Sequence, residues 1–156
     1  MYKLINETLN ALNSKLRVGG IFFELQKAFD CLNHTILLSK LQFCRVNGKA
    51  NTRFESYLKN RYMTVQISDV QLNQTSSSAW GKITDGVPQS LVLGTLLFLI
   101  YFNDMPKTLN DRTVPILFAN HTSIILKSPN LTDFQTDMLT DFHSVNKWCH
   151  ESFYIT

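Results

Sequence analysis

The chain has 156 residues, of which 44% are hydrophobic and 12% aromatic, so it is long and apolar enough to form the core of one domain and is not a disordered segment. Its net charge of +3 permits an anionic partner, but an excess this small is common among soluble domains and identifies no partner. The three cysteines cannot all pair within the chain, and the sequence does not open with a secretory leader. We therefore expect an intracellular protein, nuclear or cytoplasmic, that is not secreted. The longest apolar stretch, residues 91–102, is shorter than the roughly 20 residues that a membrane helix needs, so no membrane span is predicted.

The first half of the chain is predicted to contain a helix, a strand and two further helices. Apolar residues at helical spacing predict an amphipathic helix from Leu4 to Leu16, which Gly19-Gly20 should end. The apolar run at residues 21–25 predicts a central strand. Asp30, after this strand, is a candidate N-cap. Two further helices are predicted at residues 34–47 and 50–60.

The second half is predicted to contain two hairpins, each followed by a helix. Alternating polar and apolar residues predict a hairpin with strands at 61–67 and 76–83. A buried helix should follow the Pro88 turn and end at Phe102. Apolar runs flank Phe118-Ala119-Asn120-His121, which is therefore predicted to be the turn of a second hairpin. The last predicted helix spans residues 132–150. This order of elements predicts an α+β fold with one antiparallel sheet backed by helices.

Three short motifs follow one another along the chain: Phe22–Asp30, Gly86–Gly94 and Phe118–His121. Together they resemble the palm of a reverse transcriptase of the non-LTR (LINE-like) retrotransposon family, and the resemblance extends over most of the chain. It implies a polymerase palm-like fold, RNA-directed DNA polymerase activity, Mg²⁺ as cofactor, and an RNA template and DNA primer as partners. Complete fingers and thumb have no counterpart here. Residues 1–156 are therefore expected to be a partial, truncated reverse transcriptase domain whose exposed edges a protein partner could cover.

The resemblance places the family's metal-ligand positions, which are aspartates in the family, at Glu24, Asn120 and His121. Nucleotide addition uses two divalent cations about 3.5–4 Å apart, and Mg²⁺ takes hard oxygen ligands. Glu24 keeps the charge, but its extra methylene displaces the carboxylate by roughly 1 Å, a shift that can cost about 100-fold in rate. Asn120 offers a neutral oxygen, and His121 offers a nitrogen that suits Zn²⁺ better than Mg²⁺. The chain is therefore predicted to be catalytically inactive, with Glu24 a weak metal ligand at most.

Each of these positions also has a plain structural interpretation. Glu24 could be a strand-end acid paired with Lys27 or an arginine. Asn120 tolerates the left-handed backbone conformation of turns, and His121 is a residue type common on surfaces. We therefore favour a structural role in the turn for both residues. A zinc site is disfavoured, because its candidate ligands lack the short paired spacings that such sites need. These ligands would be His121, His143, Cys149 and His150.

The resemblance also assigns positions that bind the nucleotide or template. Phe29 matches the bulky aromatic residue that excludes the 2′-hydroxyl of an incoming nucleotide, and Gln89 matches the glutamine after the Val-Pro turn. From the residues alone, Phe29 could equally be a core aromatic residue and Gln89 a turn residue. Ser90 and Leu91 stand where the family has glycine and serine, and Leu91 should obstruct the template path or shift the turn.

The sequence therefore predicts the reverse transcriptase domain of a non-LTR retrotransposon without polymerase activity. One alternative is a domesticated nucleic-acid-binding or protein-interaction module that keeps the fold without the chemistry, and another is a non-functional relic. Basic residues within 27–61, interleaved with aromatic residues, could line a nucleic-acid groove, although a solvated helix face is the favoured interpretation.

Overall fold

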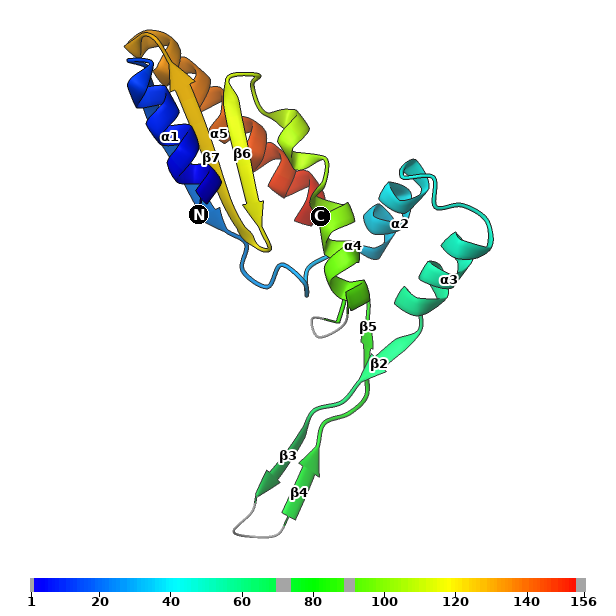
Figure 1. The fold of residues 1–156 in the computed structure, drawn as a ribbon. Helices are drawn as coiled ribbons and strands as arrows, with labels where there is room; N and C mark the ends of the chain where they lie inside the picture. The colour runs from blue at the N-terminus through cyan, green and yellow to red at the C-terminus, as the bar shows by residue number, and fades with distance from the viewer. Residues whose placement is uncertain (1, 70–73, 89–91, 154–156) are drawn as a thin grey trace. The chain divides into compact units, whose positions relative to one another are not determined.

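The computed structural model of the chain describes residues 2–69, 74–88 and 92–153 (Figure 1). These residues form α-helices and antiparallel sheets, which confirms the predicted α+β class. The contacts divide the chain into two compact units. Unit 1 consists of Met1–Ala28 and Tyr101–Thr156, and unit 2 consists of Phe29–Ile100.

Unit 1 is built on a three-stranded antiparallel sheet in which β7 lies between β1 and β6. The strands span Arg17–Glu24 (β1), Thr113–Phe118 (β6) and His121–Ser128 (β7). Their register places both Glu24 of β1 and Phe118 of β6 opposite His121. The end of β1 therefore lies beside the turn that joins β6 to β7, as the predicted hairpin requires.

The structure corrects two predictions about β1. The sequence predicts a central strand at residues 21–25, whereas β1 begins at Arg17 and, among the described residues, pairs only with β7. It is therefore an edge strand of this sheet. Gly19 and Gly20 do not end the first helix but lie inside β1. A Cβ at Gly19 would lie 2.4 Å from Cζ of Phe134, so this glycine allows a helix to approach the strand closely.

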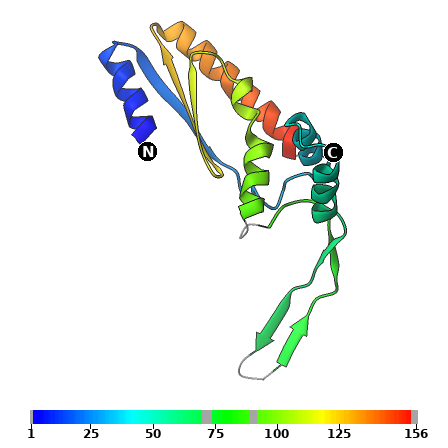
Figure 2. The same ribbon diagram turned by 45° about the vertical axis from the view of Figure 1, so that its right-hand side comes forward.

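Two helices cover opposite faces of this sheet (Figures 1 and 2). They are α1 (Tyr2–Asn13) and α5 (Leu131–Phe153), which confirm the first and last predicted helices with ends shifted by one to three residues. Side chains alternate between the two faces of a strand. Gly19 faces α5 through Phe134, whereas Lys127, on the other face, hydrogen-bonds to Glu7 of α1.

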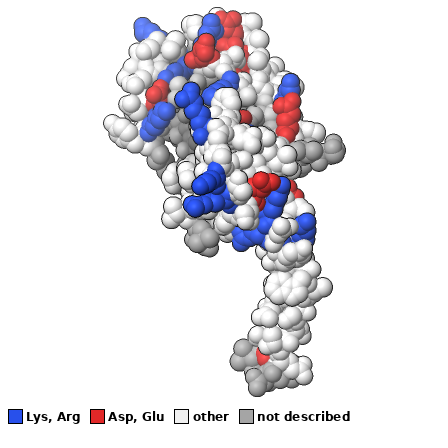
Figure 3. Space-filling model, turned by 90° about the vertical axis from the view of Figure 1, so that its right-hand side faces the viewer, with Lys and Arg blue, Asp and Glu red and all other residues white. Residues whose placement is uncertain are grey.

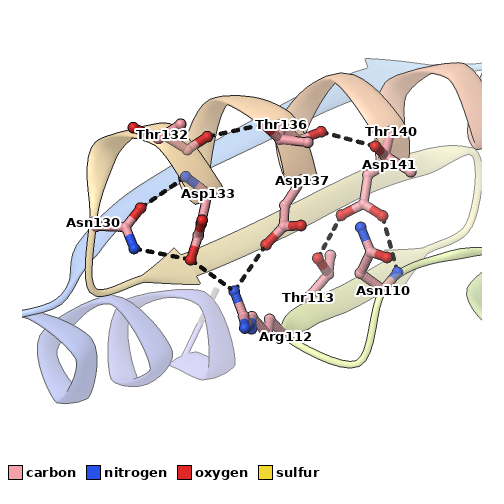
Figure 4. Close-up of polar contacts among 10 residues, drawn as sticks. All are labelled: Asn110, Arg112, Thr113, Asn130, Thr132, Asp133, Thr136, Asp137, Thr140 and Asp141. Carbon is pink, nitrogen blue, oxygen red and sulfur yellow. Dashed lines mark hydrogen bonds and ion pairs between the residues drawn. The ribbon is translucent and has the colours of Figure 1, made fainter.

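Polar side chains fasten α5 to the residues that precede β6 (Figure 4). Asn130 caps the helix by accepting a hydrogen bond from the backbone N–H of Asp133 at 2.7 Å. Arg112 Nη1 lies 3.6 Å from Asp133 Oδ2 and 3.4 Å from Asp137 Oδ2. These charges are partly exposed, so they orient the segment more than they stabilise it.

A buried carboxylate completes this attachment one helical turn further along (Figure 4). Asp141 is only 1% exposed. Its carboxylate accepts hydrogen bonds from the backbone N–H of Asn110 at 2.9 Å and from the hydroxyl of Thr113. Because both donors lie close to the start of β6, Asp141 ties the sheet to the helix that backs it.

The contact between Glu7 and Lys127 predicts an acid-dependent step in stability. The hydrogen bond and charge of Lys127 hold the pKa of Glu7 below its ordinary value of 4.5. A carboxylate with a lowered folded-state pKa contributes its full stability above the unfolded-state pKa and loses it as the pH falls through the folded-state value. We therefore expect Glu7→Gln to lower Tm at about pH 7, and the difference from wild type to shrink toward zero in acid. Thermal unfolding measured across this pH range checks it, and a difference that does not change with pH would contradict it.

Unit 2 begins with two short helices that pack against each other, α2 (His34–Phe43) and α3 (Lys49–Leu58). Both helices confirm the prediction. The predicted N-cap, Asp30, is wrong, because residues 26–31 form turns before the helix starts. Asn33 caps α2 instead, its Oδ1 accepting hydrogen bonds from the backbone N–H groups of Thr35 and Ile36 at 3.0 and 3.1 Å.

A long hairpin, residues 61–83, forms an arm that extends away from α2 and α3 (Figure 1). Its base pairs β2 (Arg61–Met63) with β5 (Gly81–Ile83), and its outer part pairs β3 (Gln66–Asp69) with β4 (Gln74–Ser77). The predicted hairpin is thus confirmed. Figure 3 shows a nearly uncharged arm, with lysine and arginine side chains gathered around its base and acidic side chains among them.

The apolar segment after Pro88 forms α4 (Val92–Phe102), followed by a 3₁₀ turn, η1 (Met105–Thr108). The predicted helix is confirmed, but the prediction that it is buried holds for one side only. Leu97 and Phe98 are almost fully buried, whereas Val92 is 90% and Leu99 54% exposed. Within the described ranges, the chain has no helix of the length and apolarity that crossing a membrane requires.

Candidate functional site

The turn between β6 and β7 positions the side chains of the candidate site. Ala119 adopts a left-handed backbone conformation, with φ of +50°. Asn120 lies in this turn, as predicted, although the left-handed residue is Ala119. The carbonyl oxygen of Asn120 accepts a hydrogen bond from the backbone N–H of Leu25 at 3.1 Å. The turn therefore pairs with the chain just beyond β1, and this pairing places the side chain of Asn120 next to Glu24.

The structure brings the three predicted metal-ligand positions together. Asn120 Nδ2 donates a hydrogen bond to Glu24 Oε1 at 2.8 Å. On the other side of the carboxylate, His121 Nδ1 lies 3.8 Å from Glu24 Oε2. The alternative in which Glu24 pairs with Lys27 or an arginine is therefore replaced by a pair of contacts to the hairpin itself.

This arrangement limits what the site can do chemically. It holds a single carboxylate, whose two oxygens face an amide and an imidazole. The side chains of Glu24 and His121 are 56% and 59% exposed, so water competes for both. Among the residues that the structure describes, no group of three or more His, Cys, Asp or Glu side chains could hold a metal ion. The geometry provides one carboxylate with an amide and an imidazole beside it, rather than a cluster of oxygen ligands.

The predicted nucleotide- and template-binding positions lie in unit 2 or outside the described residues. Phe29 stacks on Phe98 with ring centroids 4.7 Å apart and an interplanar angle of 30°, which is the contact expected of a core aromatic residue. Its role at a nucleotide site stays a prediction. Gln89, Ser90 and Leu91 lie outside the described residues.

A glycine beside this segment is required by packing. A Cβ at Gly94, in the first turn of α4, would lie 1.9 Å from the carbonyl oxygen of Pro88. The helix therefore approaches the backbone of the Val-Pro turn as closely as only glycine allows. This close approach explains why the last residue of the motif Gly86–Gly94 is a glycine.

Unit 2 also contains a pocket of about 560 Å³ at the base of the arm. The guanidinium of Arg61, one of its lining residues, lies 5.1 Å from the centre of the Tyr57 ring, a cation–π contact that orients it. The pocket has the size of a small-ligand site. The other lining residues are Asp30, Met63, Ile83, Asp85, Gly86, Val87 and Pro88.

Sequence reasoning missed two residues of unit 1 that lie beside the candidate site. Phe22 and Phe118 are 63% and 78% exposed. Phe118 pairs with His121 across the sheet, and Phe22 precedes Glu24 by two residues on β1. The signal was present in the sequence, because residues two apart on a strand share a face.

No family model matches the sequence. The chain is similar to the probable RNA-directed DNA polymerase from transposon X-element of Drosophila melanogaster, with 26% identity over 131 residues that cover 82% of this chain. It is also similar to the RNA-directed DNA polymerases from mobile element jockey of D. melanogaster, with 25% identity over 95% of this chain, and of D. funebris, with 28% over 91%. The matched regions are only 14–16% of the length of these relatives. The resemblance to the RNA-directed DNA polymerases of non-LTR retrotransposons that the three motifs predict is therefore confirmed over most of the chain.

Proposed function

We propose that this chain is a palm-like reverse transcriptase module, partial in extent, that has lost the polymerase chemistry of its relatives. The observation that carries the proposal is the hydrogen bond of 2.8 Å from Asn120 Nδ2 to Glu24 Oε1. It occupies the remaining carboxylate at the three positions to which the resemblance assigns metal binding. The three-stranded sheet, its hairpin and the helices on its two faces support the palm-like part of the proposal.

The residues at these positions do not fit Mg²⁺, the cofactor implied by the resemblance. Mg²⁺ requires near-octahedral oxygen coordination, and an amide nitrogen and an imidazole nitrogen point at the carboxylate in its place. A cation that approaches Glu24 Oε1 competes with the hydrogen bond from Asn120. Since electrostatic stabilisation is usually the largest single contribution to catalysis, replacing two of the three anionic side chains removes most of the catalytic power.

Metal binding tests this proposal directly. We expect the wild-type chain to bind Mn²⁺ at least about 10-fold more weakly than the triple variant Glu24→Asp/Asn120→Asp/His121→Asp, because affinity rises with the number of charged oxygen ligands. The loss of the electron paramagnetic resonance signal of free Mn²⁺ during titration measures both affinities. Glu24→Ala is the matched control and should bind no more tightly than wild type.

A second assay addresses the chemistry. Wild-type protein should not extend a DNA primer on an RNA template with Mg²⁺ or Mn²⁺ above the level of Glu24→Ala. Extension that disappears in Glu24→Ala, or Mn²⁺ affinity equal to that of the triple variant, would overturn the proposed loss of activity.

The second candidate function is a nucleic-acid-binding or protein-interaction module without polymerase activity. The exposed rings of Phe22 and Phe118 favour a binding role for the sheet, and RNA or DNA is the class of partner that the relatives suggest. A protein partner is supported by the apolar residues that α1 exposes, Tyr2, Ile5, Leu9 and Leu12. The free cysteines Cys31, Cys44 and Cys149 support a reducing, intracellular location.

A further inference from the structure

The helix α1 carries a stripe of apolar side chains that the rest of the described chain leaves uncovered. They are Tyr2, Ile5, Leu9 and Leu12, which are 84%, 51%, 53% and 56% exposed. Figures 1 and 2 show α1 as an outer layer of unit 1. A surface helix of a soluble domain normally presents polar residues to water, and a contiguous exposed apolar stripe marks a place where another surface binds. The stripe is therefore a candidate interface.

The spacing of the stripe is that of a helix-packing seam. Its members follow one another at intervals of three, four and three residues, which is the alternation of positions a and d in a heptad repeat. Side chains at this spacing insert between the side chains of a facing helix. The spacing therefore indicates that the partner surface is itself a helix.

Contacts with the sheet hold α1 in place before any partner binds. Ala11, on another side of the helix, is 2% exposed, and Glu7 forms an ion pair with Lys127 of β7. A free helix of 12 residues is marginal in water. Because the sheet already orders α1, association does not have to offset the entropy of forming the helix. A seam shorter than two heptads can therefore support a weak interface.

The seam is complementary to a second copy of itself. If two copies of α1 pack antiparallel, Tyr2 of one copy lies opposite Leu12 of the other, and Ile5 lies opposite Leu9. Both pairs are centred on position 7 of the sequence, so one two-fold axis through the middle of the helix satisfies them together. This is the isologous arrangement of a symmetric dimer, in which the same patch serves both partners.

The charges of α1 favour this pairing over a charged partner. Lys3 and Glu7 are the charged residues of the helix, and Glu7 is turned toward the sheet. Asn6, Thr8 and Asn13, at the heptad positions beside the seam, carry no charge that would repel an identical copy. Antiparallel packing also places the N-terminus of each helix beside the C-terminus of the other, where the helix dipoles attract. A partner with charged flanking residues would find no matching charges there.

We infer that the chain forms a weak symmetric dimer in which two copies of α1 pack antiparallel through this seam. A seam of this length buries less than the roughly 800 Å² per partner of stable complexes, so the dimer should form reversibly as concentration rises. The inference goes beyond the proposed function, because the seam lies on a different element from Glu24, Asn120 and His121.

Sedimentation equilibrium of the whole chain tests for this dimer. Wild type should associate reversibly. Ile5→Lys and Leu9→Glu should each weaken association at least about 10-fold, because each places a charge in an apolar seam. Leu139→Lys is the matched control, because Leu139 is 60% exposed on α5, the helix on the opposite face of the sheet, and this variant should associate like wild type.

A mixture of the two charged variants tests the antiparallel orientation. A mixed dimer brings the introduced lysine of Ile5→Lys opposite the introduced glutamate of Leu9→Glu, and its other layer keeps Leu9 against Ile5. We therefore expect the mixture to associate at least about 10-fold more tightly than either variant alone. A mixture that associates no more tightly than the separate variants would overturn the antiparallel seam.

The remaining outcomes are equally decisive. A wild-type chain that stays monomeric up to about 1 mM, or a dimer that Ile5→Lys leaves intact, would overturn the inference. A loss in Leu139→Lys equal to that in Ile5→Lys would do the same. Circular dichroism and thermal unfolding verify that each variant is folded, which the exposure of these side chains leads us to expect. Each of these results leaves the proposed loss of metal binding standing, since that loss is measured by Mn²⁺ titration.

Discussion

Replacing Asp141 with alanine is expected to lower the free energy of unfolding by about 3–4 kcal/mol. The carboxylate is 1% exposed and accepts hydrogen bonds from the backbone N–H of Asn110 at 2.9 Å and from the hydroxyl of Thr113. Alanine removes the acceptor, leaves both donors away from water without a partner, and opens a small cavity. Urea unfolding with an unchanged m-value measures the loss.

Asp137 provides the matched control for this prediction, because it lies one turn earlier on α5 and its side chain is 23% exposed, 3.4 Å from Arg112. Asp137→Ala should cost less than about 1 kcal/mol, as exposed ion pairs do. Asp141→Asn keeps the shape and one acceptor oxygen, so its loss should fall between the two. Equal losses for Asp137→Ala and Asp141→Ala would contradict the role assigned to the buried carboxylate.

Gly86→Ala is expected to cost about 3 kcal/mol of unfolding free energy in unit 2. Gly86 has a φ of +86°, and a Cβ there would lie 2.6 Å from the backbone oxygen of Asp30. Both the left-handed conformation and the contact with backbone oppose any side chain. The substitution should also disturb the hydrogen bond of 2.8 Å from Gly86 N–H to the carbonyl oxygen of Leu32 and the contact of 2.7 Å between His34 Nε2 and the Gly86 carbonyl oxygen.

Gly81→Ala is the control for this second prediction. The nearest atom to a Cβ at Gly81 is the backbone oxygen of Met63 at 3.9 Å, and its φ is not in the left-handed region. Its unfolding free energy should stay within about 0.5 kcal/mol of wild type. Urea unfolding compares both variants. A Gly86→Ala protein as stable as Gly81→Ala would show that the turn can shift away from Asp30 at no cost.

Secondary-structure elements that depend on residues close together in the chain could be predicted from the sequence. The hairpin at Phe118–His121, the arm at residues 61–83 and the helices from α2 to α5 all appear where spacing and turn residues predict them. Their patterns record contacts between residues that are close in sequence, which periodicity can detect. The N-cap of α2 shows the limit of this approach. Asp30 and Asn33 have similar capping ability, and only the path of the turns before the helix decides between them.

Features that depend on distant partners did not follow from the sequence. Gly19 has the local signature of a helix end, but its reason is the ring of Phe134 on another element. Asp141 has the pattern of one more polar residue on α5, yet it is buried against Asn110 and Thr113. Such roles require the packing of elements that are far apart along the chain, about which local spacing carries no information.

The same division applies to the candidate site. The resemblance predicts from the sequence that Glu24, Asn120 and His121 stand where the family has aspartates. Only the tertiary structure decided what the remaining carboxylate contacts. Asn120 is 96 residues from Glu24, and the register of β1 on β7 brings the amide, the imidazole and two exposed phenylalanine rings to one end of the sheet. Pairing between strands is a long-range property, so the contacts of Glu24 and its aromatic surroundings became visible only in the folded chain.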